Sequence, residues 1–412
     1  MPMTLRERLL TTLRGGASDR IPWNIYAWLA PDTEAARTLH RKGLGFMATR
    51  RIFRPLYDGV TVTEERKSIG GQPHFYTRIE TPVGVLTEEA VLEPNYGSRW
   101  IRKFFIAGLE DYAAAEYFFR HTRFEPDFAP WHQADAEMGD GGIVVGEIMP
   151  IPIMTLMVSW MGVERMVEGI YDHPERFEAL IDALNQHYDR HIQLAAESPA
   201  EIVWFGDNVT GTVISPKLFA RYCAPTYARA VPVLQSAGKI PIAHYDGSNR
   251  PLVHCLAQTD LPVIEAFTPP PMGDLSVAEA KAAWPDKVVW VNFPGSLFLE
   301  PAEVIHAYTL DLLCEGAGPG PGRAVTDPPL RGGLAERGWS GPGRAVTDPP
   351  LRGGLAEGAC PELVEGAGPE PGEGAPGGRL VVGCTEDFPL GEFEKTFTAI
   401  GRALAEYEGY EW

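Results

Sequence analysis

The feature that most constrains the fold is an alternation of short apolar runs with longer helical segments, which begins at Gly142 and continues to the end of the chain. The runs are rich in β-branched residues and have few polar interruptions. Such runs are typical of parallel strands that are buried on both faces and covered by helices. The predicted strands are residues 21–27, a run from 142, and 201–208, 240–247, 262–269, 288–295 and 380–387.

The segments between these runs have helical periodicity. Ser215 and Ser276 are plausible helix starts because a serine side chain can cap the first free backbone N–H groups. No Gly-rich phosphate loop follows a strand, which argues against a Rossmann or P-loop fold. We therefore predict an α/β fold, a single (β/α)8 TIM barrel that spans residues 1–412. The predicted helices are 154–197 with a break near 172–174, 216–237, a short one after Pro251, 278–283, 301–313 and 392–406.

Two segments depart from this pattern. Residues 55–100 alternate polar and apolar positions between Gly-rich turns, which predicts an antiparallel hairpin excursion near the barrel mouth. Residues 316–373 contain 15 Gly and 10 Pro, and the string GPGRAVTDPPLRGGLAE occurs twice in them without a difference. Two identical copies lack the divergence and the apolar face of a solenoid. We expect a disordered surface insertion without a catalytic role, with an interaction arm as the alternative.

The overall charge and the cysteine content exclude several functions. The net charge is −19, so the surface repels phosphate backbones and nucleic-acid binding is not expected. Five irregularly spaced cysteines do not form a disulfide framework, and free thiols fit a cytoplasmic location. The charged N-terminal segment lacks the apolar core of a signal peptide, and no membrane span is expected.

In a TIM barrel the active site lies where the strands end at their carboxyl termini. Polar side chains follow the apolar runs at these positions in the sequence. They are the candidates for catalysis and substrate binding: Glu147, Asp207, Asn208, His244, Tyr245, Asp246, Glu265, Asn292, Cys384, Glu386 and Asp387.

His244 and Asp246 are two residues apart on one predicted strand, so their side chains are expected on the same face. With Cys384 from the last strand they could form a three-ligand zinc site with an open fourth position. The alternatives are a turn at Asp246-Gly247 and a Cys384 that serves as a small buried apolar residue.

Three carboxylates are candidate acid–base groups. Glu265 lies within the apolar run VIEAF, where burial would raise its pKa, although a structural salt bridge is equally compatible. Asp207 faces either the mouth or the next helix, and we favour the mouth. Glu386 and Asp387 are adjacent, so at most one of them serves the site. Asn208, Tyr245, Asn292 and Glu147 are expected to bind substrate, whereas Cys223, Cys255, His187 and His254 are expected to be packing or surface residues.

Three stretches resemble uroporphyrinogen-decarboxylase-like proteins: TLRERLLTTLRGGASDRIPW at the start, DNVTGTVISPKLFARYCAPTYARAVPVLQSAGKIPIAHYDG in the middle, and GCTEDFPLGEF near the end. The resemblance extends over nearly the whole chain except the insertion. It implies a single (β/α)8 barrel and one of two chemistries. These are cofactor-free decarboxylation of uroporphyrinogen, and zinc-dependent methyl transfer that involves a corrinoid protein.

The residues distinguish the two chemistries in part. The Arg-rich signature R-Q-A-G-R of the decarboxylases is absent, and the matching stretch IPWNIYAWLAP has no Arg to bind substrate carboxylates. The methyltransferases typically carry H-x-C and a later Cys. Here the resemblance maps these ligands onto His244, Asp246 and Cys384, with Asp in place of the usual Cys. A carboxylate would activate a thiol less, which argues against thiol methylation. An ether or amine substrate is compatible with this ligand set, and so is a divergent member with another substrate.

We therefore predict a methyltransferase in a corrinoid system. The residues expected to transfer a proton or to position the substrate are Glu265, Asp207 or Glu386. Those expected to bind zinc are His244, Asp246 and Cys384. The corrinoid (cobalamin) would sit on a partner protein because the chain has no D-x-H-x-x-G motif. The other partner is a small methyl donor or acceptor, and a homodimer is compatible with the sequence. The alternatives are a tetrapyrrole decarboxylase and a non-catalytic corrinoid- or tetrapyrrole-binding relative.

Overall fold

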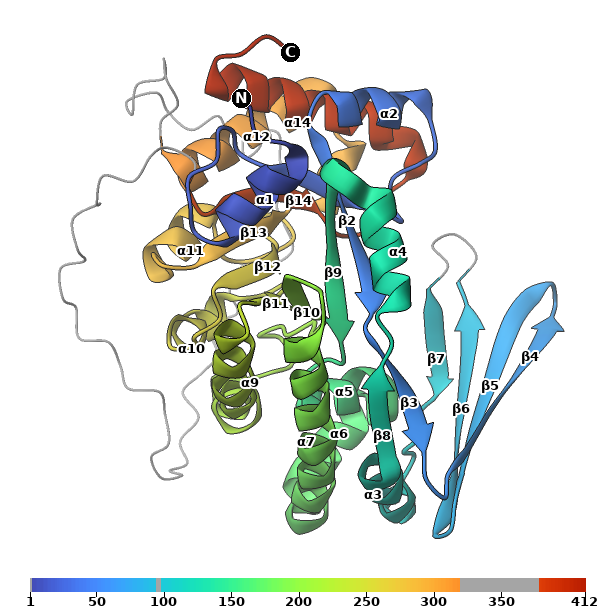
Figure 1. Ribbon diagram of the computed structural model, residues 1–412. Helices are drawn as coiled ribbons and strands as arrows, with labels where there is room; N and C mark the ends of the chain where they lie inside the picture. The colour runs from blue at the N-terminus through green and yellow to red at the C-terminus, as the bar shows by residue number, and fades with distance from the viewer. Residues whose placement is uncertain (1, 94–97, 319–377) are drawn as a thin grey trace.

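The computed structural model describes residues 2–93, 98–318 and 378–412. Its centre is a closed barrel of parallel strands in the order β1-β14-β13-β12-β11-β10-β9-β2 (Figure 1). The predicted (β/α)8 barrel is therefore confirmed. Its strands are β1 (Trp23–Tyr26), β2 (Leu44–Arg51), β9 (Gly142–Ile148), β10 (Ile202–Phe205), β11 (Ile240–His244), β12 (Val263–Phe267), β13 (Val288–Asn292) and β14 (Leu380–Cys384).

Strand β2 closes the barrel and was not among the predicted strands. It pairs with β1 on one side and with β9 on the other. Its sequence LGFMATRR ends in exposed or half-buried positions from Thr49 onward, so it lacks the continuous apolar character of the other strands. A prediction based on continuous apolar runs therefore does not detect this strand.

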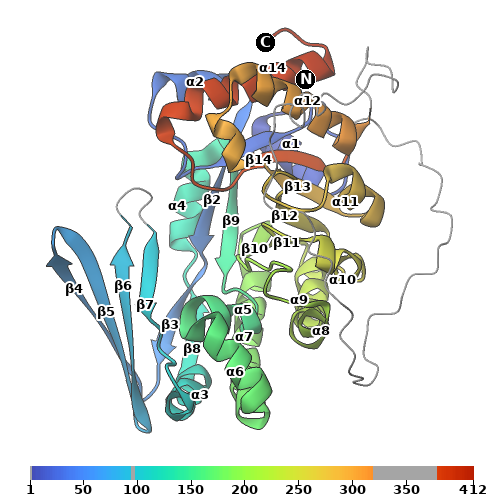
Figure 2. The same cartoon turned by 180° about the vertical axis from the view of Figure 1, so that it is seen from behind.

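Helices surround the barrel on its outer face (Figures 1 and 2). Both predicted serine caps are present. Ser215 accepts a hydrogen bond from the backbone of Leu218, and Ser276 forms a reciprocal capping box with Glu279. The longer helices are α2 (Glu34–Arg41), α4 (Ala129–Met138), α6 (Gly162–Asp172), α7 (Pro174–Glu197), α9 (Ala224–Ser236), α12 (Ala302–Ala317) and α14 (Phe393–Glu408), and the shorter ones are α5 (Pro152–Thr155), α8 (Pro216–Leu218), α10 (Val253–Ala257) and α11 (Val277–Ala283).

The barrel interior is a packed core. Alternate residues of each strand face inward, as period 2 requires. Helix α1 (Leu5–Leu13) contributes Leu9 and Leu13 to the same interior cluster, so it closes the N-terminal end. The inward-facing side chains include Met47, Ile143, Val145, Ile202, Ile240, Ile242, Val263, Val288, Trp290 and Val381. A ligand can therefore approach the interior from the C-terminal end.

The predicted antiparallel excursion is present and is larger than a hairpin. Strands β4 (Thr61–Ile69), β5 (Gln72–Thr81), β6 (Gly84–Leu92) and β7 (Arg99–Lys103) form a sheet beside the barrel (Figure 1). A second pair, β3 (Phe53–Tyr57) with β8 (Thr122–Pro126), connects this sheet to the barrel end at which β2 and β9 stop. Helix α3 (Tyr112–His121) packs on β5 and β6.

The predicted insertion, residues 316–373, lies outside the described residues except for its first three positions. Helix α12 continues through Ala317, so Gly316 belongs to that helix. A Cβ atom at Gly316 would lie 2.7 Å from Leu380 Cδ2, which shows close packing against β14.

Among the described helices, none combines the length and the apolar character that a membrane span requires.

Candidate active site

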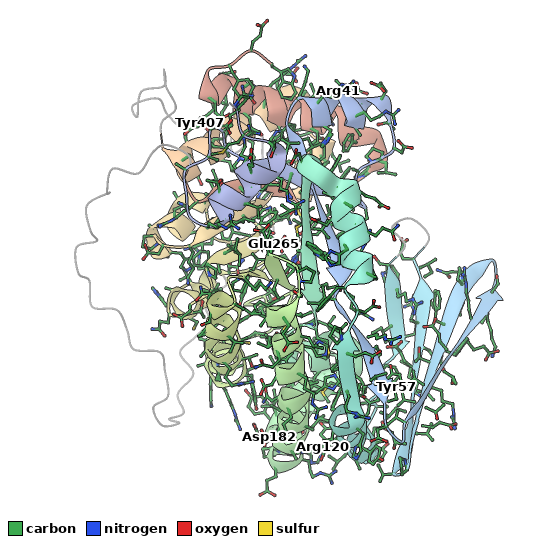
Figure 3. All side chains as sticks on the ribbon, viewed as in Figure 1. Arg41, Tyr57, Arg120, Asp182, Glu265 and Tyr407 are labelled. Carbon is green, nitrogen blue, oxygen red and sulfur yellow. The ribbon has the colours of Figure 1, made fainter. Side chains whose placement is uncertain are left out.

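Four side chains meet at the inner C-terminal end of the barrel, and we call them the mouth group: Tyr26, Trp204, His244 and Glu265. Glu265 lies at the centre of the barrel (Figure 3) and is fully buried. Its Oε2 atom lies 2.9 Å from His244 Nδ1 and accepts a hydrogen bond from Trp204 Nε1 at 2.9 Å. Its Oε1 atom accepts a hydrogen bond from the Tyr26 hydroxyl at 2.7 Å. One carboxylate thus holds three neighbours from β1, β10 and β11.

Strand alternation explains why these residues meet. Tyr26 belongs to the interior cluster, and Trp204 packs against it. His244 continues the inward series Ile240 and Ile242, and it lies opposite Glu265 in the register of β11 with β12. Because adjacent parallel strands are about 4.8 Å apart, opposed inward side chains are within hydrogen-bonding reach.

The backbone beside Glu265 is irregular. The register between β12 and β13 passes from Ile264 opposite Val289 to Phe267 opposite Val291, so β12 contains one extra residue. Ala266 has a φ of +57°, a conformation that costs free energy for a residue with a Cβ atom. Bulges of this kind redirect a side chain next to many active sites.

The surroundings favour the protonated form of His244. Burial alone would lower the pKa of this imidazole. The charge of Glu265 and its hydrogen bond act in the opposite direction and raise the pKa of His244 above its usual value, with Asp246 and Glu386 adding to the effect. Burial, followed by the charge of Glu265, raises the pKa of Tyr26 well above its usual range, so the phenol stays neutral. The surroundings therefore favour the protonated imidazole of His244 and the neutral phenol of Tyr26.

A second polar network lies beside the mouth group. Asn292 Nδ2 donates to Glu386 Oε1 at 2.8 Å and to Thr268 Oγ1 at 3.1 Å. Asn292 Oδ1 accepts a hydrogen bond from the backbone N–H of Thr385 at 3.1 Å. Burial, and then the charge of Asp246, raises the pKa of Glu386. The structure thus brings the predicted residues Asn292 and Glu386 together next to His244.

Asp207 is not directed at the mouth, contrary to the orientation that we favoured from the sequence. Its carboxylate is fully buried, accepts a hydrogen bond from the backbone N–H of Ile151 at 2.7 Å, and accepts another from the Tyr227 hydroxyl at 2.5 Å. Tyr245 donates to Tyr227 at 2.9 Å and belongs to the outer core. Burial raises the pKa of Asp207 to about 6. Asp207 and Tyr245 therefore connect β10, β11 and α9 behind the barrel wall, while Asn208 is exposed.

Strand alternation does not place the three proposed zinc ligands on one face. Cys384 follows Leu380 and Val382 on the face that packs against the helices, whereas Val381 faces the interior. Strand β11 ends at His244, so the alternation that would align Asp246 with it does not extend that far. Within residues 2–93, 98–318 and 378–412, no three His, Cys, Asp or Glu side chains form a group that could hold a metal.

Burial raises the pKa of the Cys384 thiol, and its Sγ atom lies 3.8 Å from the carbonyl oxygen of Glu386. His244 uses Nδ1 for Glu265. In this arrangement the described residues do not present a three-ligand zinc group.

Glu147 lies at the end of β9, where it continues the inward series Ile143 and Val145. It is opposite Trp204 in one neighbouring strand and opposite Arg51 in the other. The candidate Glu147 is therefore at the edge of the mouth rather than at its centre. Tyr26 and Trp204 were not identified from the sequence, although both are inward positions at the ends of predicted strands.

Residues 136–322, from α4 to just beyond α12, match the family model described as "Uroporphyrinogen decarboxylase (URO-D)". No curated protein matches the sequence. One similar solved structure comes from a study of inhibition of the pneumococcal virulence factor StrH and of N-glycan recognition and hydrolysis, with 12% identity, a TM-score of 0.32, and coverage of 94% of this chain and 85% of the other. No inference is drawn from a similarity of that degree.

Proposed function

We propose that this chain, which matches the uroporphyrinogen decarboxylase family model over residues 136–322 and forms a closed parallel barrel, is a methyltransferase that demethylates a small ether or amine. The methyl group would pass to a corrinoid carried by a partner protein. The observation that carries the proposal is the buried His244–Glu265 pair at the barrel mouth, with 2.9 Å between Nδ1 and Oε2. In this proposal the pair acts as a general acid that protonates the departing atom as the carbon–heteroatom bond breaks.

The protonation step follows from the hydrogen bonds. Glu265 accepts from Nδ1 of His244, so the Nε2 proton of the imidazolium is the one available to a substrate. As the bond between the methyl carbon and the heteroatom breaks, His244 would donate this proton to the departing oxygen or nitrogen. The product leaves as a neutral alcohol or amine, and a proton from water restores the imidazolium. A reduced corrinoid, when bound, supplies the nucleophile for the methyl carbon.

Tyr26 and Trp204 act as positioning residues in this proposal. Both donate hydrogen bonds to Glu265, at 2.7 Å and 2.9 Å, and so fix the carboxylate that orients the imidazole. The Tyr26 hydroxyl also lies 3.3 Å from His244 Nδ1. Together they hold the pair in one arrangement before the substrate binds, which lowers the cost of reorganisation during the reaction.

The charge of the site supports a neutral or cationic substrate. Asp246, Glu265 and Glu386 all influence His244, so the charged groups around it are mostly negative. A substrate with many carboxylates would be repelled unless cationic side chains compensated for its charge. This balance favours methyl transfer over decarboxylation of a polycarboxylated tetrapyrrole.

The rim of the mouth supports a partner protein. Loops after β1, β12, β13 and β14 expose the large apolar side chains Trp28, Met272, Leu299 and Leu390, with exposed fractions from 45% to 69%. Exposed apolar groups around an opening are typical of surfaces that bind another protein or a large cofactor. A corrinoid protein that docks there would place its cofactor over His244.

Two parallel assays test the proposal. The purified protein is incubated with reduced cobalamin, as a substitute for the partner's cofactor, and with methanol or anisole, and methylated cobalamin is measured. The same preparation is given uroporphyrinogen, and carbon dioxide release is measured. We expect methylation with at least one donor, and a loss of it in His244→Ala. Carbon dioxide release without methylation would replace this proposal with decarboxylation, which the family match over His244 and Glu265 also allows.

A further inference from the structure

An aromatic cavity lies next to the mouth, between the barrel and the β3–β8 pair. Its volume is about 430 Å³, within the usual range for sites that bind small molecules. Its walls come from the ends of β2 and β9, from β3 and β8, from helices α3 and α7, and from the segment η3 (Leu156–Met161). The labelled Tyr57 marks the β3 side of this region in Figure 3.

Six aromatic side chains line the cavity. Trp160 packs against Phe119 with 4.4 Å between ring centroids and against Phe118 with 5.1 Å. Phe53 and Phe124 meet edge to face at 5.2 Å on the opposite strands. These contacts fix the rings in place, so the cavity is a preformed slot for another flat ring. The six residues are Phe53, Tyr57, Phe118, Phe119, Phe124 and Trp160.

One buried polar group in the cavity wall is an acceptor. His187 Nδ1 lies 3.1 Å from the carbonyl oxygen of Phe119, which can only accept, so Nδ1 carries the proton. Burial lowers the pKa of His187 to about 4, so the ring is neutral near pH 7 and Nε2 has a free lone pair. A ligand that donates a hydrogen bond therefore matches this wall better than one that only accepts.

Two further features lie at or beside this wall, although His191 is not itself a lining residue. His191 lies one turn after His187 on α7, edge-on to Phe53 and Phe124 at 4.1 Å and 4.0 Å. Neither of its ring nitrogens has a hydrogen-bond partner among the described residues, which costs free energy that an apolar residue would avoid. The segment η3 is a π-helix, and such irregular turns frequently occur at functional sites.

We propose that this cavity binds a hydroxylated single-ring aromatic compound. The ring would lie among Trp160, Phe119 and Phe124, and its hydroxyl group would donate to His187 Nε2. Glu147 lines the cavity and is opposite Trp204, which donates to Glu265, so the cavity adjoins the mouth group. The assignment of this ring to the methyl-bearing substrate rests on the proposed function, whereas the binding itself does not.

Fluorine NMR titration of the full-length protein tests the binding. The probes are 4-fluorophenol and fluorobenzene, which differ by the hydroxyl group alone. We expect 4-fluorophenol to bind about tenfold more tightly, since the difference is one buried hydrogen bond. In His187→Phe this preference should disappear while fluorobenzene binding is retained.

A second pair of variants locates the site. Ser159 lines the cavity and is half-buried, so Ser159→Trp should fill it and abolish binding of both probes. Val158→Trp adds the same ring at a 37% exposed neighbour outside the lining and should leave binding unchanged. Absence of binding by either probe, binding that Ser159→Trp leaves intact, or a hydroxyl preference that persists in His187→Phe would overturn the inference. None of these assays involves methyl transfer, so their failure and that of the proposed function are separate results.

Discussion

Replacement of Glu265 by Gln changes the charge of the mouth group while its shape is kept. In the native protein three donors point at one carboxylate, from Tyr26, Trp204 and His244. A glutamine side chain has one carbonyl oxygen and an NH2 group that can only donate. At least one of the three donors then faces another donor, or His244 must lose its Nδ1 proton.

The structure gives the size of both consequences. A buried donor without a partner costs about 1–3 kcal/mol, so the variant should be less stable by that amount. Burial then acts on His244 without its compensating charge, and the pKa of His244 should fall. Loss of the protonated form removes a general acid, which is typically worth about 10²–10⁴-fold in rate.

The pH dependence separates these effects. His244 has a raised pKa in the folded state, so its protonation stabilises the fold at low pH, and this contribution is lost as the pH rises through the folded pKa. In Glu265→Gln the contribution should shrink, and the deficit in methyl transfer should become smaller as the pH is lowered.

The assay is an NMR titration of the His244 ring in wild type, Glu265→Gln and Glu386→Gln. Glu386 raises the pKa of His244 through its charge, but its carboxylate accepts a hydrogen bond from Asn292 rather than from the imidazole, so its variant is the control with the smaller expected effect. An unchanged or higher pKa of His244 in Glu265→Gln would refute the reasoning.

Three other predictions follow from the described contacts. Burial raises the folded-state pKa of Asp207 to about 6 from an ordinary 3.8. The protonated carboxyl therefore contributes its full stabilisation below pH 4, and about 3 kcal/mol of it is lost as the pH rises through 6. Thermal melts from pH 4 to 7 should show this loss in the wild type and not in Asp207→Asn. Deletion of residues 316–373 places Gly374 and Ala375 directly after Glu315, so the end of α12 keeps its sequence. The melting temperature and the activity should stay nearly unchanged. A large loss of either would show that the segment is structural. Cys384→Ala removes a thiol that faces the helices, so metal content by plasma mass spectrometry should match wild type, and loss of one bound zinc per chain would contradict the placement of Cys384.

The sequence was sufficient for the barrel and for part of the site. Continuous apolar runs marked every barrel strand except β2, whose second half is polar. The same runs located His244, Glu265, Asn292 and Glu386 at strand ends, where the structure brings them together. Continuous apolar runs are informative here because each of these strands is buried on both faces.

The sequence did not determine which face of a barrel strand each residue occupies. A shift of one residue in the assumed boundary reverses the inward and outward positions. Cys384 therefore falls on the helix face, and Asp207 binds Ile151 and Tyr227 behind the barrel wall. Counting from Ile25, which is outward, would have identified Tyr26 as an inward residue of the mouth.

Dependence of the methyl-transfer rate on the leaving group tests the central claim most directly. His244→Ala and wild type are compared on methyl donors whose leaving groups range from strongly to weakly basic, with reduced cobalamin as the acceptor. If His244 protonates the departing atom, the methyl-transfer rate of the variant should fall about 10²–10⁴-fold with strongly basic leaving groups and only slightly with weakly basic ones. An equal loss across the series, or no methyl transfer by the wild type with any donor, would contradict the account.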